Sequence, residues 1–185
     1  MNLSVIIGAA VLLIIVIFAI ICYNSLVAKS NLVEEAFSGM DVIFKKRYDL
    51  IPNLVETIKG YAGYEKETLA EIVSLRNQAL SAGQTNEKIQ LDNNISQSVT
   101  KILALSENYP DLKASTNFLA LQSELSLIET DIERAKRYYN GTIRDYNVSV
   151  QSFPNNLVAG IFRFSKKDFL ELFDATQRES PKVQF

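Results

Sequence analysis

The residues from Glu124 to Arg137 form the densest group of ionisable side chains, and acid–base catalysis is the chemistry that they could carry out. Two carboxylates can serve as general acid and general base when both face one reacting group. Helical spacing does not place positions 124, 129 and 133 on one face, and basic residues balance the acidic charge. We therefore interpret the group as the salt-bridged surface of a helix. Its members are Glu124, Glu129, Asp131, Glu133, Arg134, Lys136 and Arg137.

Histidine is absent from the sequence, and the single cysteine is Cys22. Ser–His and Cys–His nucleophiles, most zinc sites and the Glu-x-x-His di-iron sites of helical bundles all need an imidazole. Glycine is scarce, and the sequence contains neither a phosphate-binding loop nor a dinucleotide-binding fingerprint. We therefore expect no catalytic residues, no cofactor and no metal, and we predict that the protein is not an enzyme.

A long apolar run opens the sequence. Residues 3–22 are almost wholly apolar, and no acidic or basic residue (Asp, Glu, Lys, Arg or His) occurs through Ala28. About 20 apolar residues in a helix cross the ~30 Å hydrocarbon layer of a bilayer. The alternative, a cleaved signal peptide, would have a basic start, an apolar stretch of only ~7–15 residues and a small-residue cleavage site. The run does not fit that pattern, so residues 1–28 are predicted to be a retained transmembrane anchor.

The charge distribution bears on partners and on orientation. The formal net charge is −2, and no basic cluster is larger than Lys45–Lys46–Arg47, which excludes a strongly basic nucleic-acid binder. Lys29 and this basic triplet follow the apolar run, whereas only the amino terminus precedes it. Because the cytoplasmic flanks of membrane helices are enriched in Lys and Arg, the soluble domain is expected to be cytoplasmic.

Beyond the anchor, apolar residues recur at helical spacing, and no β-hairpin pattern of comparable strength occurs. The first helix is expected to leave the bilayer, to kink or break near residues 49–52 because Pro52 removes a backbone donor, and to resume through Lys59. Three more helices are predicted, over residues 64–81, 86–108 and 112–153. The predicted fold is all-α: an N-terminal transmembrane helix that continues into an antiparallel up-and-down bundle of long helices over residues 29–156.

The last predicted helix carries the strongest pattern. From Leu121 to Phe153, apolar residues step by three or four positions without a break, which is typical of a bundle or coiled-coil seam. A seam of this length exceeds what a monomer readily covers, so we expect a homo-oligomer. The preferred function is a non-enzymatic, membrane-anchored scaffold or adaptor. The alternative is a ligand-sensing bundle that signals across the membrane, although only Met1 and Asn2 precede the anchor.

Short motifs spread along the chain match the pattern of one known family. They are Tyr23–Asn24–x–Leu26–Val27, Glu35–Ala36–Phe37, Lys46–Arg47–x–Asp49–Leu50–Ile51–Pro52–Asn53–Leu54–Val55–Glu56, Lys59–Gly60–Tyr61, Glu107–x–Tyr109–Pro110–x–Leu112, Ala135–x–Arg137–x–Tyr139–Asn140, Tyr146–Asn147 and Phe153–Pro154. In combination they resemble the bacterial LemA family over about residues 20–164. The chain departs from the family pattern at Phe37, where many members have Trp, and at Glu129–Thr130–Asp131, which replaces a more usual Glu–Asn pair.

The resemblance carries expectations of its own. It implies a single-pass, membrane-anchored helical bundle without an established catalytic activity. It also implies a link to membrane stress, a partner of the HtpX-type membrane protease class and, through the related magnetosome protein MamQ, a role in membrane remodelling.

Matched family positions supply the candidate structural and interaction residues. The charged ones either form an inter-helix ion network that fixes the register of the helices or remain on solvated helix faces. Five aromatic residues at helical spacing are expected to belong to the core rather than to a ligand site: Phe118, Tyr138, Tyr139, Tyr146 and Phe153. The candidates are Arg47, Asp49, Pro52, Glu65, Glu107, Tyr109, Pro110, Glu124, Arg137, Tyr139, Asn140, Phe153 and Phe162.

An aromatic tail, residues 157–185, follows the bundle. In an up-and-down bundle the fourth helix returns towards the membrane, so the tail is expected to lie near Tyr23. Two interpretations stay open. The tail either lies at the lipid headgroups, where Arg163, Lys166 and Lys167 would suit it, or folds back to cap the bundle or a neighbouring subunit.

Overall fold

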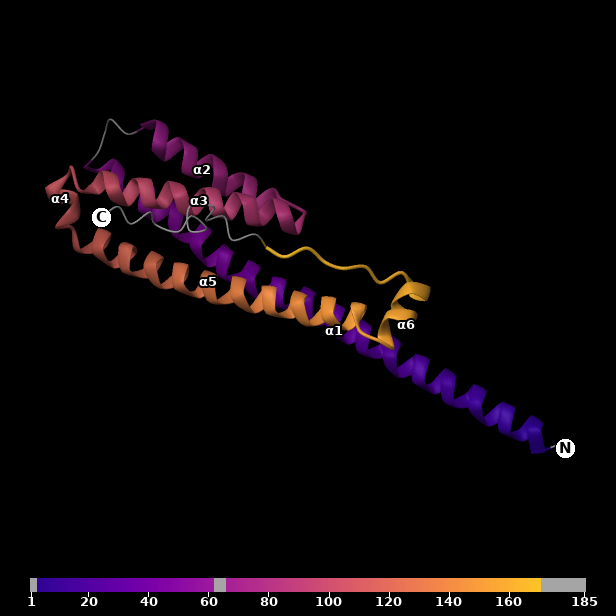
Figure 1. The fold of residues 1–185 in the computed structure, drawn as a ribbon. Helices are drawn as coiled ribbons and strands as arrows, with labels where there is room; N and C mark the ends of the chain where they lie inside the picture. Colours follow the sequence, from indigo (N-terminus) through magenta and orange to yellow (C-terminus); the bar gives the residue numbers. More distant parts are fainter. Residues whose placement is uncertain (1–2, 62–65, 171–185) are drawn as a thin grey trace, which may run out of the picture. The chain divides into compact units, whose positions relative to one another are not determined.

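The computed structural model describes residues 3–61 and 66–170. Of these residues 87% are helical and none lies in a strand, which confirms the predicted all-α fold. The helices are α1 (Leu3–Lys59), α2 (Lys66–Ser81), α3 (Thr85–Ser106), α4 (Pro110–Lys113), α5 (Thr116–Gln151) and α6 (Asn155–Phe162) (Figure 1).

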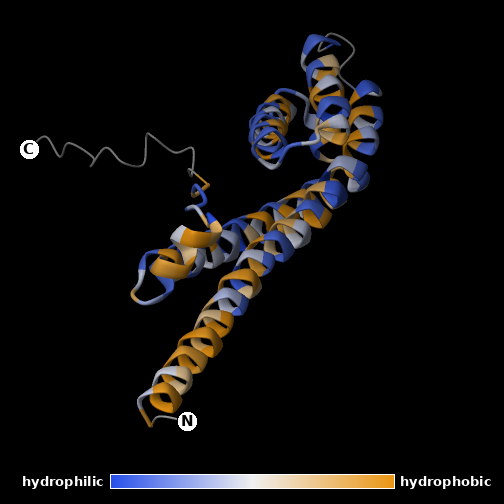
Figure 2. Cartoon of the chain, turned by 90° about the vertical axis from the view of Figure 1, so that its right-hand side faces the viewer, coloured by the Kyte–Doolittle hydropathy of each residue, from blue (hydrophilic) through white to orange (hydrophobic). Residues whose placement is uncertain are grey.

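Helix α1 begins with the apolar run. Within the described part of the chain it is the one helix long and apolar enough to cross a membrane, and it stands as a candidate membrane anchor. Its first turns are hydrophobic on every side (Figure 2). The side chains there are almost all exposed, which is compatible with a candidate membrane anchor.

The chain divides into two compact units. Within the described residues, the first unit contains residues 3–38 and 136–170, and the second contains residues 39–61 and 66–135. Helices α1 and α5 each contribute one part to each unit.

In the first unit, α1 and α5 run antiparallel. The ring of Phe37 lies 6.1 Å from that of Tyr139, and further back along α1 the Lys29 amine donates to the carbonyl of Asp145 over 3.5 Å. The Phe153–Pro154 peptide bond is cis and leads into α6. Residues 164–170 follow outside any helix as an extended trace (Figure 1), and we call this segment the strap. Buried apolar side chains of this unit include Leu26, Val33, Ile143, Tyr146, Val150 and Val158.

The second unit is a four-helix bundle made from residues 39–59 of α1, from α2, from α3 and from residues 116–135 of α5. Lys88 of α3 pairs with Asp41, and Asp92 pairs with Arg47, so α3 runs parallel to α1. The short connections reverse the chain between successive helices, in the predicted up-and-down order. Its buried apolar side chains include Met40, Phe44, Ile51, Leu54, Ile72, Ile95, Phe118 and Ile132.

Of the kink or break predicted near Pro52, the break is wrong, because α1 continues through this residue to Lys59. Proline lacks the backbone N–H that would bond to the carbonyl four residues earlier, which is that of Tyr48. In the structure Nε of Arg76, on α2, donates to this carbonyl over 2.8 Å. A side chain from the neighbouring helix therefore replaces the hydrogen bond that proline removes.

Other boundaries differ from the prediction by a few residues. The last long helix begins at Thr116 rather than at residue 112, because Pro110 starts a separate turn, α4, in which proline occupies the first helical position. That helix ends at Gln151 rather than at residue 153. The aromatic tail was not predicted to contain a helix, yet its first residues form part of α6.

Candidate functional site

The buried ion cluster of the second unit consists of Arg47, Asp92, Ser96 and Glu129. Arg47 is only 1% exposed although its guanidinium carries a full charge. One of its terminal nitrogens donates to Ser96 Oγ and Glu129 Oε2, each over 2.6 Å. The other donates to the carbonyl of Asp92 over 2.9 Å and forms an ion pair with the Asp92 carboxylate. The cluster thus joins α1, α3 and α5.

This geometry suits structural positioning rather than catalysis. A guanidinium stays protonated under physiological conditions, so it supplies no proton to a reaction. Its planar arrangement of donors instead fixes the orientation of each acceptor. Because a one-residue slip of any of the three helices would leave charges buried without their partners, we infer that the cluster specifies the register of the second unit.

Of the five charged candidates that the structure describes, Arg47 is the one that belongs to the buried ion cluster. Arg47 lies at the centre of the cluster, and its partners Asp92 and Ser96 were not among the candidates. Glu129 was interpreted as part of a helix surface; its side chain is 43% exposed, and it also pairs with the buried arginine. Of the others, Asp49 pairs locally with Lys45, Glu107 pairs with Lys113, Glu124 and Arg137 lie on exposed turns of α5, and Glu65 lies outside the described residues.

Tyr48 lies beside the cluster and is buried. Burial, together with the negative charge of Asp92, raises the pKa of its phenol above the ordinary value. Burial also raises the pKa values of Tyr139 and Tyr146 in the first unit. These shifts oppose ionisation and identify the three phenols as core groups that stay neutral.

The raised pKa of Tyr48 predicts a loss of stability in alkali. The folded protein favours the protonated phenol, so this contribution is fully present below the unfolded pKa of about 10 and is lost as the pH rises above it, by about 1.4 kcal/mol per pH unit. We expect Tyr48→Phe to flatten the dependence of the melting temperature on pH above about pH 10. The same substitution at the exposed Tyr61 is the control, and equal effects of both would contradict the prediction.

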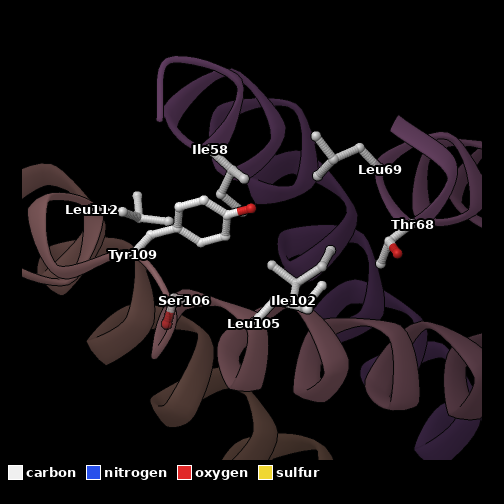
Figure 3. Close-up of a pocket in the computed structure, with 8 residues that line it drawn as sticks. All are labelled: Ile58, Thr68, Leu69, Ile102, Leu105, Ser106, Tyr109 and Leu112. Atoms are coloured by element: carbon white, nitrogen blue, oxygen red, sulfur yellow. The ribbon is translucent and has the colours of Figure 1, made fainter. Parts of the chain in front are cut away.

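The second unit contains a small cavity between α1, α2, α3 and α4 (Figure 3). Its volume is about 10 Å³, which is room for no more than about one water molecule. An open groove of about 700 Å³ runs between the end of α1 and α2. The small cavity is lined by Ile58, Thr68, Leu69, Ile102, Leu105, Ser106, Tyr109 and Leu112, so the candidate Tyr109 belongs to this apolar wall.

Two asparagines of α5 hold the strap in the first unit. Asn147 donates to the carbonyl of Lys167 over 2.8 Å and accepts from its backbone N–H over 2.9 Å. Asn140 makes the same pair of bonds to Leu170, over 3.1 and 2.8 Å. The hydroxyl of Tyr146 adds a bond to the carbonyl of Ser165 over 3.0 Å.

The spacing of these contacts explains why they fit. Seven residues of helix separate Asn140 from Asn147, a rise of about 10.5 Å. Three residues of extended chain separate Lys167 from Leu170, about 10 Å. The side-chain amides of Asn140 and Asn147 are therefore spaced like the backbone groups of residues 167 and 170. They pair with the N–H and C=O groups of the strap as a neighbouring β-strand would. The strap runs antiparallel to α5.

The side chain of Lys167 ties the strap to α1 as well. Its amine donates to the carbonyl of Ser30 over 3.5 Å and lies 3.7 Å from the carboxylate of Glu34. It also sits 5.3 Å from the centre of the Tyr146 ring, within range of a cation–π contact. One basic residue thus joins the strap to both long helices of the first unit.

Aromatic contacts bring the tail to the end of the apolar run. The ring of Phe162 lies 4.8 Å from that of Tyr23, and the ring of Phe164 lies 5.7 Å from it. The expected proximity of the tail to Tyr23 is therefore confirmed. The core interpretation holds for Phe118, Tyr139 and Tyr146, which are buried. It is wrong for Tyr138, which is 58% exposed on the outer side of α5, and for Phe153, which is 79% exposed because it follows the end of α5.

The described residues give little support for a catalytic or metal-binding role. Within residues 3–61 and 66–170, no group of three or more His, Cys, Asp or Glu side chains is placed to hold a metal ion. The remaining candidates are structural: Pro52 lies inside α1, and Pro110 begins α4.

A comparison of this sequence with models of protein families agrees with the helical fold, the apolar first helix and the short motifs. The model described as the LemA family matches residues 36–185. This chain belongs to the LemA family, which is not a known enzyme family.

Individual relatives agree with this assignment. Protein LemA of Metamycoplasma hominis is 28% identical over 137 residues, which cover 74% of this chain and 63% of the relative. Magnetosome protein MamQ 2 of Paramagnetospirillum magneticum is 19% identical over 175 residues, with 80% of this chain and 64% of the relative covered. Magnetosome protein MamQ of Magnetospirillum gryphiswaldense is 18% identical over 173 residues. The chain therefore spans a little under two thirds of the length of these relatives.

Proposed function

We propose that this protein is a non-enzymatic scaffold or adaptor that is anchored in a membrane by the start of α1 and self-associates there. The observation that carries the proposal is the continuity of α1. A single helix of 57 residues includes both the apolar run and the residues around Arg47 that organise the second unit. A continuous helix of this kind joins the bundle to the membrane-spanning segment without an intervening linker.

Self-association is supported by two exposed leucines on the part of α5 that belongs to the second unit, Leu119 and Leu127, which we call the stripe. Leu119 is 48% exposed and Leu127 is 66% exposed. Eight residues of helix, a little over two turns, separate them, so both lie on one side of α5. The buried residues of this part of the helix, such as Leu125 and Ile132, lie on the opposite side. Exposed leucines opposite the core suit packing against a second surface.

The stripe gives a direct test of the scaffold. We expect Leu119→Glu combined with Leu127→Glu to shift the detergent-solubilised protein towards the monomer, with self-association weaker by about tenfold or more, because each leucine loses a burial worth about 1.5–3 kcal/mol. Native mass spectrometry or sedimentation measures the change.

Gln122→Glu is the matched control, since it adds the same charge to an exposed position of α5 outside the stripe. An unchanged assembly in the double variant would contradict the role of the stripe. A wild-type chain that is a discrete monomer and binds a small molecule, for example in the groove between α1 and α2, would instead favour the ligand-sensing function.

Three narrower statements complete the proposal. The positions of Lys29 and Lys45–Lys46–Arg47 favour a cytoplasmic soluble domain, and a reporter at the C-terminus that is active only outside the membrane would overturn this orientation. A proposed link to membrane stress, and a proposed partner of the HtpX-type protease class, rest on the resemblance to the family. Co-purification of the tagged chain with such a protease tests the partner.

A proposed role in membrane remodelling rests on the similarity to the MamQ magnetosome proteins.

A further inference from the structure

Helix α6 and the turn before it expose apolar side chains on the surface of the first unit. Ile161 is 74% exposed and Phe153 is 79% exposed, and Leu157 and Phe162 are also exposed. The opposite side of α6 is apolar too, because Val158 and Ala159 are buried against the rest of the unit. A helix that is hydrophobic all round normally has cover on every side.

The position of α6 is fixed by its contact with α1. Residues 3–22 of α1 supply about 30 Å of apolar helix, which is the thickness of the hydrocarbon layer. The water-facing boundary of that layer therefore falls near Tyr23, where tyrosine is a favoured residue. The ring of Phe162, at the end of α6, lies 4.8 Å from the ring of Tyr23.

We propose that α6 and Phe153 form a second membrane contact, in which the exposed side chains of Phe153, Leu157 and Ile161 enter the headgroup region of the leaflet that α1 crosses. The inference rests on the proposed membrane anchor. The buried side of α6 holds it against its own unit, and its exposed side meets lipid.

Lipid suits this surface better than a protein partner does. The surface continues the apolar run of α1 in space, since Tyr23 directly follows that run and contacts Phe162. Exposed basic side chains, Arg163 and Lys166, follow α6 and match the phosphates of lipid headgroups. An apolar face with cations at its edge is typical of helices that lie in the membrane interface.

The chain contains no tryptophan, so a single introduced tryptophan reports one position. We would reconstitute the full chain carrying Ile161→Trp into phosphatidylcholine bilayers whose acyl chains carry bromine near the headgroup end, and compare the emission with that in unbrominated bilayers. Emission is expected to fall by about twofold or more, because an interfacial side chain lies within contact range of shallow bromines. Leu157→Trp is the second variant and should behave in the same way.

Two further variants separate the outcomes. Tyr138→Trp, on an exposed turn of α5 about 20 Å along the helix from its end at Gln151, should not be quenched. Phe18→Trp reports the anchor, and its quenching without quenching at positions 157 and 161 would overturn the second contact while the anchor stands. A blue-shifted but unquenched emission at position 161 would also overturn it, because protein would then cover this face. Absence of quenching at Phe18→Trp would overturn the anchor itself.

Discussion

Replacing Asp92 with alanine is expected to destabilise the protein by about 3–5 kcal/mol, because the substitution leaves the buried guanidinium of Arg47 without its most buried partner. For a chain of this size such a loss corresponds to a melting temperature lower by about 10 °C or more. Circular dichroism of the full chain in detergent, followed at the wavelength of helix absorption, measures the shift.

Two controls make this prediction specific. Asp49→Ala removes an exposed carboxylate whose partner is one turn away, and it should change the free energy of unfolding by less than about 0.5 kcal/mol. Arg47→Met combined with Asp92→Leu removes both charges and should recover much of the loss, because apolar side chains of similar size fill the site. If Asp92→Ala melts within the range of Asp49→Ala, the cluster does not organise the second unit.

The second large effect is expected at the strap. Asn147→Ala removes both hydrogen bonds to Lys167, worth together about 2 kcal/mol, so hydrogen exchange at the backbone amide of Lys167 should be faster by about 30-fold. Asn140→Ala should act in the same way on the amide of Leu170. Residue-resolved hydrogen exchange of the full chain measures both amides.

Asn155→Ala is the matched control. It removes a hydrogen bond to Ser149 in the same unit but does not contact the strap. Exchange at Lys167 should therefore be unchanged in this variant. If Asn155→Ala and Asn147→Ala have the same effect, the strap is held by general packing and not by the pair of asparagine amides.

Much of the helical fold follows from periodicity alone. The seam of the last long helix steps by three or four positions, and its members Leu125, Ile132 and Ile143 are all buried in the structure. The length of the apolar run likewise predicts the start of α1. Both features depend only on residues close together in the sequence.

The helix at Pro52 could not be predicted in the same way. Local rules favour a break there because proline removes a donor. The compensating donor is Arg76, which lies 28 residues from Tyr48 in the sequence. Only the packing of α2 against α1 brings the two together, so the correction depends on tertiary structure.

The buried ion cluster left a clearer pattern in the sequence. Arg47 follows Phe44 by three residues and precedes Ile51 by four, so it occupies the apolar stripe of its helix. Asp92 occupies the equivalent place before Ile95 and Val99. A charged residue within each of two apolar stripes indicates a buried ion pair, although the sequence does not say which helices meet.

The asparagines that bind the strap illustrate a different limit. Asn140 was a candidate because it matches a family motif, and Asn147 lies seven residues later on the same side of α5. The repeat of seven suggests two side chains that act together. Their partner is backbone of residues 167–170, and backbone groups have no sequence pattern by which to recognise them.

The central claim is that the chain keeps its apolar first helix and assembles at the membrane. Mass spectrometry of the full chain, extracted from membranes in detergent, tests both parts in one sample. The denatured polypeptide should have the mass of the whole sequence, 20.8 kDa, and the native species should have an integral multiple of that mass. A soluble product that lacks residues 3–22, or a native species of a single chain, would contradict the account.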